Sequence, residues 1–302
     1  MRLPAAYCHI FGFKPSYGRI SRHGLVSYAS SLDTIGILGG TVEIVSRTFD
    51  VLKETGGNRD MTSWRRTSAP HASKAKRLRV LVPSNVCSDY IRGTLDEIDN
   101  TGALIKQSKH INGFADALVV YYTIAMVEAA SCLARYPLKF FPPPQVASFG
   151  PAVSERIKLG RWISSQAQSS TLYQWALERR RLLEDEIGAL FQNEEFDLIA
   201  MPTITTSPPT LEQVRASEEE LVDEEKEFNR WREILKAIDV TSSRRIDNEM
   251  LSEALQVDLL TVPASLARVP AITLPQSGLQ LMMPFGQDEE LLAVAGQLVQ
   301  RF

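Results

Sequence analysis

The chain has 302 residues, of which 44% are hydrophobic and 23% are charged, and its formal net charge is −3. This composition is typical of a globular protein with a sizeable core, and the charge excludes nucleic-acid binding through a broad basic face. The three cysteines lie far apart and the four histidines are scattered. The sequence therefore predicts reduced thiols and no metal site.

The N-terminal part of the chain predicts short elements between loops. Residues 1–40 are rich in glycine and predict mostly loop structure. Apolar residues at helical spacing predict a helix over 41–56, with Thr41 as its cap and Gly56 as its stop. Residues 57–76 are polar and basic and predict an exposed loop. The apolar run RLRVLVPS (77–84), which Pro83 ends, predicts a buried strand.

The middle and C-terminal parts alternate helical and strand patterns. Helices are predicted over 88–101, 115–136, 152–166, 172–193 and 287–301, and strands at ALIKQS (103–108) and FDLIAMPT (196–203). The apolar core of 115–136 is too short to cross a bilayer. The consecutive prolines of KFFPPPQ (139–145) exclude a helix or a central strand there. Residues 217–238 are charged on most faces, which predicts a solvated helix or a disordered insertion.

This alternation predicts the fold class. Strands that end in proline alternate with helices, which is typical of an α/β fold with a mixed β-sheet covered by helices on both faces. In such folds, binding sites lie at the carboxyl ends of strands.

Several separate stretches together resemble the amidase signature family. They are RLPAAYC, GFKPSYGRISRHGLVSYASSLDTIG, YYTIAMVEAASCLARY, FGPAVSERIKLG, DLIAMPT, DLLTVPASLARVPAITLP and GLQLMMPFG. The resemblance implies that residues 1–302 are the C-terminal two-thirds of a single amidase domain, incomplete at the N-terminus. It also marks 217–250 as a charged insertion, because this segment differs from the family pattern.

The family's catalytic residues do not fall within this sequence. In the family, the nucleophile is a serine that stands one residue before the position of Met1, and a Ser-Ser-Lys triad activates it. The resemblance therefore implies that the triad lies upstream of Met1, and that this truncated chain has no catalytic residue and is inactive alone. Lys14, Ser30 and Ser31 match family positions for which we expect structural roles.

The resemblance does place an amide-donor pocket in this chain. Arg156 matches the family arginine that holds the carboxylate of glutamine, Asp258 matches the aspartate that holds the ammonium, and Tyr121 matches a tyrosine of the same pocket. Without the resemblance, these residues are interpreted as an exposed helix arginine, a strand-edge or capping carboxylate, and an aromatic in a buried helix. Their spacing alone does not bring them together.

Two departures from the family pattern bear on this pocket. Family members usually have glycine where Arg268 stands, so we expect either a positive φ or a close contact there. The chain also runs from TLPQS directly into GLQLM, without the usual linker of a hairpin.

Within the family, the resemblance is greatest to the A subunits of glutamyl-tRNA(Gln) amidotransferases, particularly the fungal mitochondrial type. It implies glutamine hydrolysis through an acyl-enzyme, no cofactor in this chain, and a mitochondrial matrix location. It further implies a B-type partner subunit, a third small subunit, ATP and Mg at the partner, tRNA bound only through the partner, and no membrane. A general small-amide amidase and a non-catalytic remnant that binds a partner subunit remain alternatives.

Overall fold

The computed structural model describes most of the chain. The described residues are 1–54, 59–64, 77–86, 93–96, 99, 104–135, 149–165, 169–192, 196–204, 208–220, 224–238, 258–275 and 277–299. The predicted loop at 57–76, the break at 139–145 and the helix at 88–101 lie largely or wholly outside these ranges. Of that last prediction, residues 93–96 are described, and they are helical.

A seven-stranded mixed sheet forms the centre of the molecule. Its order is β2-β1-β6-β7-β5-β3-β4. The strands are β1 (Phe11–Lys14), β2 (Ile37–Gly39), β3 (Leu78–Pro83), β4 (Leu104–Lys109), β5 (Leu198–Pro202), β6 (Ala271–Thr273) and β7 (Leu279–Met282). β3 is parallel to β4 and β5, and the other neighbours are antiparallel. The prolines that end β3 and β5 lie where the sequence predicts.

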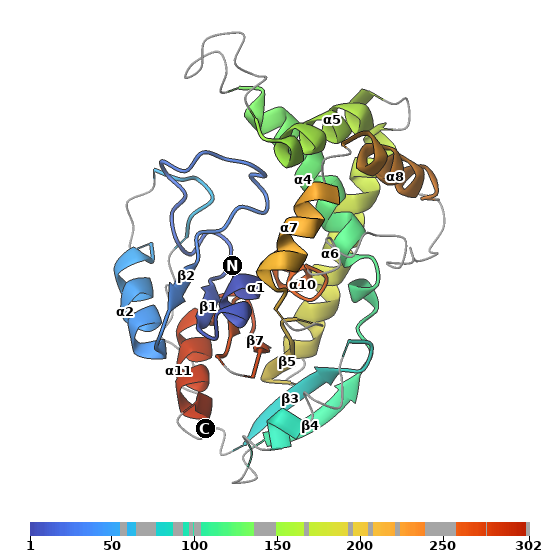
Figure 1. Ribbon diagram of the computed structural model, residues 1–302. Coiled ribbons are helices and arrows are strands. Elements are labelled where there is room, and N and C mark those ends of the chain that lie inside the picture. Colours follow the sequence, from blue (N-terminus) through green and yellow to red (C-terminus); the bar gives the residue numbers. More distant parts are fainter. Residues whose placement is uncertain are drawn as a thin grey trace.

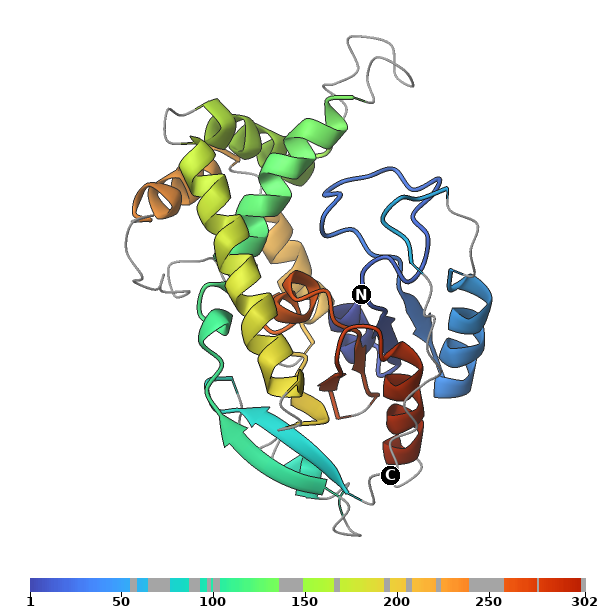
Figure 2. The same ribbon diagram turned by 180° about the vertical axis from the view of Figure 1, so that it is seen from behind.

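Helices cover both faces of the sheet (Figures 1 and 2), as the sequence predicts for the fold class. Side chains alternate between two cores, because successive residues of a strand point to opposite faces. Val80 and Val82 pack with α2 (Val42–Leu52) and α11 (Asp288–Val299). Leu81 faces the other core, which α4 (Ala117–Leu133), α5 (Pro151–Ser165) and α6 (Ser169–Gln192) build.

The other labelled helical elements are α1 (Arg2–Tyr7), the 3-10 turn η1 (Asn112–Phe114), α7 (Leu211–Glu220), α8 (Glu224–Lys236) and α10 (Val262–Leu266). In both views the N-terminus lies near α1 in the middle of the molecule, not at its outer edge (Figures 1 and 2).

The N-terminal predictions are correct in part. Thr41 caps α2 by accepting a hydrogen bond from the Ile44 backbone N–H at 3.3 Å. The helix ends at Leu52, before Gly56, because Lys53 adopts an extended conformation. Residues 1–40 contain one helix and two strands as well as the expected loops. Local patterns gave little sign of β1 and β2, which span only 11–14 and 37–39.

Helices α4 and α5 approach each other closely at Gly160. A Cβ atom there would lie 2.0 Å from the Met126 carbonyl oxygen, so only glycine permits this crossing. The contact matters for the site because α4 carries Tyr121 and α5 carries Arg156.

Helix α8 is not fully solvated, in contrast to the expectation from its charges. Trp231, Ile234 and Leu235 are buried, and the Trp231 ring lies 5.4 Å from that of Tyr122. One apolar face therefore packs on the bundle, while Arg230, Glu233 and Lys236 are exposed. Residues 221–223 and 239–250 lie outside the described residues, and the insertion at 217–250 stays a prediction.

The segment after α10 confirms the expectation for Arg268. Its φ is +60°, a conformation that favours glycine. Its carbonyl accepts a hydrogen bond from the Tyr17 N–H at 3.1 Å, and its Nε lies 3.2 Å from a Glu184 carboxylate oxygen. The chain then forms β6 and β7, and the Leu274 N–H donates to the Leu279 carbonyl at 2.8 Å to close the hairpin without a longer linker.

The backbone at residue 268 predicts a difference between two substitutions. Both Arg268→Gly and Arg268→Ala remove the guanidinium, but only alanine keeps a Cβ at positive φ. We expect Arg268→Gly to have the higher free energy of unfolding, by about 1 kcal/mol. Urea unfolding of the two variants measures the difference. An alanine variant as stable as the glycine variant would contradict a left-handed backbone at this position.

Candidate functional site

A cavity of about 300 Å³ opens beside the N-terminus. Five parts of the chain line it: the first two residues, the end of β1, the loop 28–34, helix α4, and the segment from 258 to 265. The lining residues are Met1, Arg2, Lys14, Tyr28, Ala29, Leu32, Asp33, Thr34, Tyr121, Asp258, Thr261, Val262 and Ser265. Of the described strands, only β1 contributes to the lining, through Lys14 at its carboxyl end.

The three residues predicted for a pocket lie close together in space. Tyr121 and Asp258 both line the cavity. Arg156 lies behind the lining, where its guanidinium hydrogen-bonds to the Tyr28 phenol and lies 5.9 Å from the centre of the Tyr122 ring. The substrate-binding roles of these residues stay predictions.

The Asp258 segment is fixed by a buried arginine that sequence reasoning missed. The Arg2 guanidinium is 4% exposed and donates to the Gln280 side chain, to the Thr261 carbonyl and, at 3.1 Å, to the Ser265 hydroxyl. Burial lowers its pKa to about 10, although the nearby Asp258 opposes this shift. Arg2 therefore stays charged at neutral pH and holds α10 and the preceding turn against α1 and β7.

Two tyrosines of α4 surround the Asp258 carboxylate. The Tyr122 hydroxyl donates to Asp258 Oδ2 at 3.2 Å, and the Tyr121 and Tyr122 rings meet edge to face, with their centroids 5.5 Å apart. Burial and then the negative charge of Asp258 raise the pKa of Tyr121 to about 12, and the same two causes raise the pKa of Tyr122. Both phenols are therefore neutral at physiological pH.

Lys14 adds a second buried basic side chain to the wall. Its Nζ donates to the Pro15 carbonyl at 3.0 Å. Burial and then the positive charge of Arg2 lower its pKa well below the usual range, while Asp288 opposes the shift. Asp288 is also buried, and it accepts hydrogen bonds from the Ser16 backbone and hydroxyl at 2.7 and 2.8 Å. These buried hydrogen bonds stabilise the end of β1 where Lys14 lines the cavity.

The loop 28–34 is stabilised by Asp33. This carboxylate accepts hydrogen bonds from the Ser27 hydroxyl at 2.9 Å and from the backbone N–H groups of Tyr28 and Ala29 at 2.9 and 3.1 Å. Because both of its oxygens already accept hydrogen bonds from the loop, Asp33 acts on the cavity mainly by shaping this wall.

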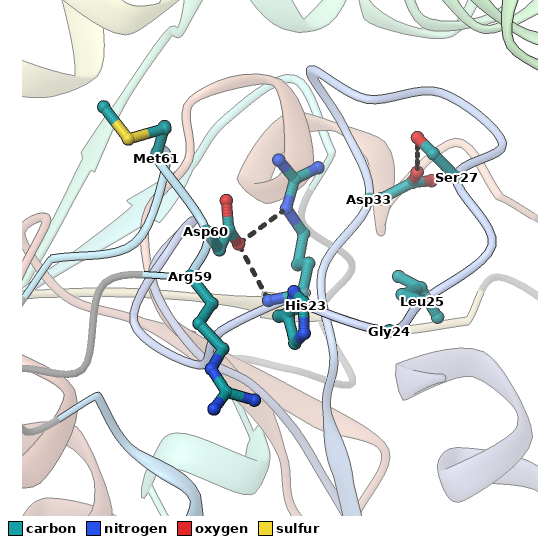
Figure 3. Close-up of a pocket in the computed structure, with 9 residues that line it drawn as sticks. His23, Gly24, Leu25, Ser27, Asp33, Arg59, Asp60 and Met61 are labelled. Carbon is teal, nitrogen blue, oxygen red and sulfur yellow. Dashed lines mark hydrogen bonds and ion pairs between the residues drawn. The ribbon is translucent and has the colours of Figure 1, made fainter.

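A second hollow of about 290 Å³ shares Asp33 with the first cavity and is also lined by Ser27 and Asp60 (Figure 3). Asp60 accepts a hydrogen bond from the Arg22 backbone N–H at 2.8 Å and pairs with the Arg22 guanidinium at 3.6 Å. Figure 3 also shows the hydrogen bond between Ser27 and Asp33. The polar groups here therefore contact one another. We interpret this hollow as an open part of the loop framework.

Sequence reasoning missed the roles of Arg2, Tyr28 and Tyr122. Tyr28 belongs to the stretch SYASS and Arg2 to RLPAAYC, both of which carry the family resemblance. Their contacts join residues far apart in the chain: 278 positions separate Arg2 from Gln280. Local spacing gives no signal for such pairs.

A comparison with known protein families shows to which family the chain belongs. The family described as Amidase matches residues 1–299. The chain belongs to the amidase family. The cavity is formed by the stretches that carry the family resemblance, including RLPAAYC, SYASSLDTIG and DLLTVPAS.

Relatives of this chain within the family include A subunits of glutamyl-tRNA(Gln) amidotransferases. The mitochondrial protein of Candida albicans (strain WO-1) is 33% identical over 337 aligned residues, which cover 99% of this chain and 68% of the relative. The protein of Sulfurisphaera tokodaii is 30% identical, over 99% of this chain and 61% of the relative. The chain thus spans about two-thirds of the length of these relatives.

Solved structures share the fold at lower identity. A 6-aminohexanoate cyclic dimer hydrolase superposes with a TM-score of 0.71 at 20% identity, over 99% of this chain and 62% of the other. The A subunit of the glutamyl-tRNA(Gln) amidotransferase from Thermotoga maritima superposes with a TM-score of 0.64 at 21% identity, over 97% and 58% of the two chains.

Two further observations concern the described residues alone. No three His, Cys, Asp or Glu side chains gather there as metal ligands do. No helix in the described ranges is long and apolar enough to span a bilayer.

The raised pKa of Tyr121 predicts a pH effect on stability. Its value of about 12 in the folded chain exceeds the usual 10.0, so the unfolded chain loses this proton first. The stability that Tyr121 contributes is complete below pH 10.0 and is lost as the pH rises towards 12. We expect Tyr121→Phe to show a shallower loss of unfolding free energy over this range. Urea unfolding at several alkaline pH values measures it, and parallel curves would contradict the burial of this phenol beside Asp258.

Proposed function

We propose that this chain carries the amide-donor pocket of a glutamine-hydrolysing subunit of a tRNA-dependent amidotransferase. The observation that carries the proposal is the pairing of opposite charges at one cavity. Asp258 lines it, and Arg156 lies directly behind its Tyr28 wall. The names of the Candida and Sulfurisphaera relatives support the same substrate class.

Free glutamine requires a site with this charge distribution. Its α-carboxylate suits a guanidinium, whose forked donors match two carboxylate oxygens. Its α-ammonium suits a carboxylate, and Asp258 retains one oxygen beyond the one that Tyr122 contacts. The phenols of Tyr28 and Tyr121 add hydrogen-bonding groups between these two ends. The carboxamide of the substrate then extends towards the remaining wall, at Met1 and Lys14.

The proposed nucleophile fits that wall. In the family, the serine precedes the residue that Met1 matches, and Met1 itself lines the cavity. Adjacent Cα atoms lie about 3.8 Å apart, so a serine supplied at that position lies at the same wall. Its oxygen attacks the carboxamide carbon, and the lysine of the Ser-Ser-Lys triad passes the serine proton to the departing nitrogen, so that the C–N bond breaks and ammonia leaves. Water then hydrolyses the acyl-enzyme ester and regenerates the serine.

The assembly follows from the same proposal. A B-type partner uses the ammonia, with ATP and Mg, to convert Glu-tRNA(Gln) to Gln-tRNA(Gln), and a third small subunit completes the hetero-oligomer. The tRNA binds through the partner, which agrees with the net charge of −3 on this chain. The mitochondrial relatives from Candida and Coccidioides support a matrix location.

One alternative concerns the substrate and the other concerns catalysis. A general small-amide amidase has no need for a carboxylate-binding arginine, so Arg156 favours glutamine over acetamide-like substrates. A non-catalytic form that retains the pocket would bind glutamine without hydrolysing it.

Calorimetry with L-glutamine tests the proposal on this chain. We expect binding to the wild-type chain, and binding at least about 30-fold weaker to Arg156→Ala, because an unpaired carboxylate in a partly buried site costs about 2–5 kcal/mol. Acetamide, which lacks both charged groups, should not compete with glutamine.

Arg161→Ala is the matched control, because Arg161 lies on the same helix and is exposed. Its affinity for glutamine should equal that of the wild-type chain. Equal affinities in all three proteins, or no glutamine binding by the folded wild-type chain, would overturn the assignment of this cavity to glutamine.

A further inference from the structure

Ser31 is held by charged side chains through each of its polar groups. Its backbone N–H donates to Glu128 Oε2 at 2.8 Å. Its carbonyl accepts from Arg180 Nη2 at 3.0 Å, and its hydroxyl accepts from Arg180 Nη1 at 2.9 Å. Glu128 lies on α4 and Arg180 on α6. Hydrogen bonds from two helices therefore hold Ser31, which lies at the middle of the loop 28–34.

Arg180 also contacts the opposite wall of the cavity. Its Nε donates to the Leu266 carbonyl at the end of α10 at 3.1 Å. The same Nε lies 3.1 Å from Glu184 Oε1, which also pairs with Arg268 at 3.2 Å. One guanidinium, 3% exposed, thus joins the loop 28–34 to the segment that follows Asp258.

These two walls supply most of the cavity lining. The loop contributes Tyr28, Ala29, Leu32, Asp33 and Thr34, and the other wall contributes 258, 261, 262 and 265. Arg180 itself lies outside the lining. Arginine suits this place because its planar fork can donate to several acceptors at once, which a lysine ammonium cannot match in geometry.

We propose that Arg180 is a positioning residue. It sets the distance between the loop 28–34 and α10, and so holds Tyr28 and Asp258 in the relative positions that the amide donor requires. This inference rests on the proposed function for the identity of the ligand, but not for the mechanical role. Loss of the fork frees three acceptors at once, two on Ser31 and one on Leu266. The loop then keeps its Glu128 and Asp33 contacts, the hydrogen bonds from Tyr17 and Arg22 to the Ser30 carbonyl, and the hydrogen bond between Tyr28 and Arg156.

Hydrogen exchange tests the mechanical role without a ligand. In Arg180→Met we expect amides of residues 28–34 to exchange about tenfold faster, while those of β3 and β5 keep their rates, because only the local opening becomes easier. Arg181→Met is the matched control, since Arg181 is the next residue of α6 and pairs on the surface with Glu178 and Asp185. It should leave the loop unchanged. A uniform change across all amides, or none in the loop, would overturn the proposal.

Two further variants keep the proposal testable if Arg180→Met does not fold. Ser31→Ala removes one hydroxyl from a partly exposed residue, and should still speed exchange in the loop; an unchanged loop would count against the proposal. Arg180→Lys keeps the charge without the fork, and we expect it to resemble Arg180→Met. Full retention of loop protection by lysine would show that charge alone suffices and would overturn the role of the fork.

Glutamine affinity links the position of the loop to the site. We expect Arg180→Met to bind L-glutamine about tenfold more weakly than Arg181→Met at equal folded fractions. Unchanged affinity together with faster loop exchange would overturn the claim that Arg180 sets the register of the site. If the wild-type chain binds no glutamine, the proposed function fails, and the exchange experiment still decides the mechanical role.

Discussion

The burial of the Arg2 guanidinium is the constraint on which the site depends. A buried charge is tolerated only when its donors find acceptors, and Arg2 finds them on β7 and around α10. This requirement places the first helix, a strand near the end of the chain and the Asp258 turn in one arrangement. Gln280 strengthens it by donating to the Leu260 carbonyl at 3.0 Å. The strand order agrees with this arrangement: β1, which follows α1, lies beside β6, and β6 lies beside β7, which carries Gln280.

Charges of both signs surround the cavity. Arg2 supplies a buried positive group, and Asp258 and Asp33 supply negative ones. Asp33 accepts hydrogen bonds from its own loop, so Asp258 remains the carboxylate best placed for a cationic ligand group. A zwitterion such as an amino acid fits this distribution better than an anion or a neutral amide does, since each of its ends meets an opposite charge.

The sequence predicted local structure well and long-range contacts poorly. Thr41 marked the start of α2, and prolines marked the ends of β3 and β5, because capping and a missing N–H act within a few residues. The charge pattern of α8 predicted a solvated helix, although Trp231 is buried. The glycine-rich sequence of residues 1–40 predicted mostly loop, although it contains two short strands. The pocket residues came from family resemblance. Arg180 could not be found in this way, because its acceptors lie 149 and 86 positions away in the chain.

A crystal structure of this chain with bound L-glutamine tests the central claim most directly. The account predicts glutamine in the cavity between Tyr28 and Asp258, with its α-carboxylate on the Arg156 side and its α-ammonium at Asp258. The carboxamide should then point towards Met1. Glutamine bound elsewhere, or bound in the cavity with its carboxylate facing away from Arg156, would contradict the account.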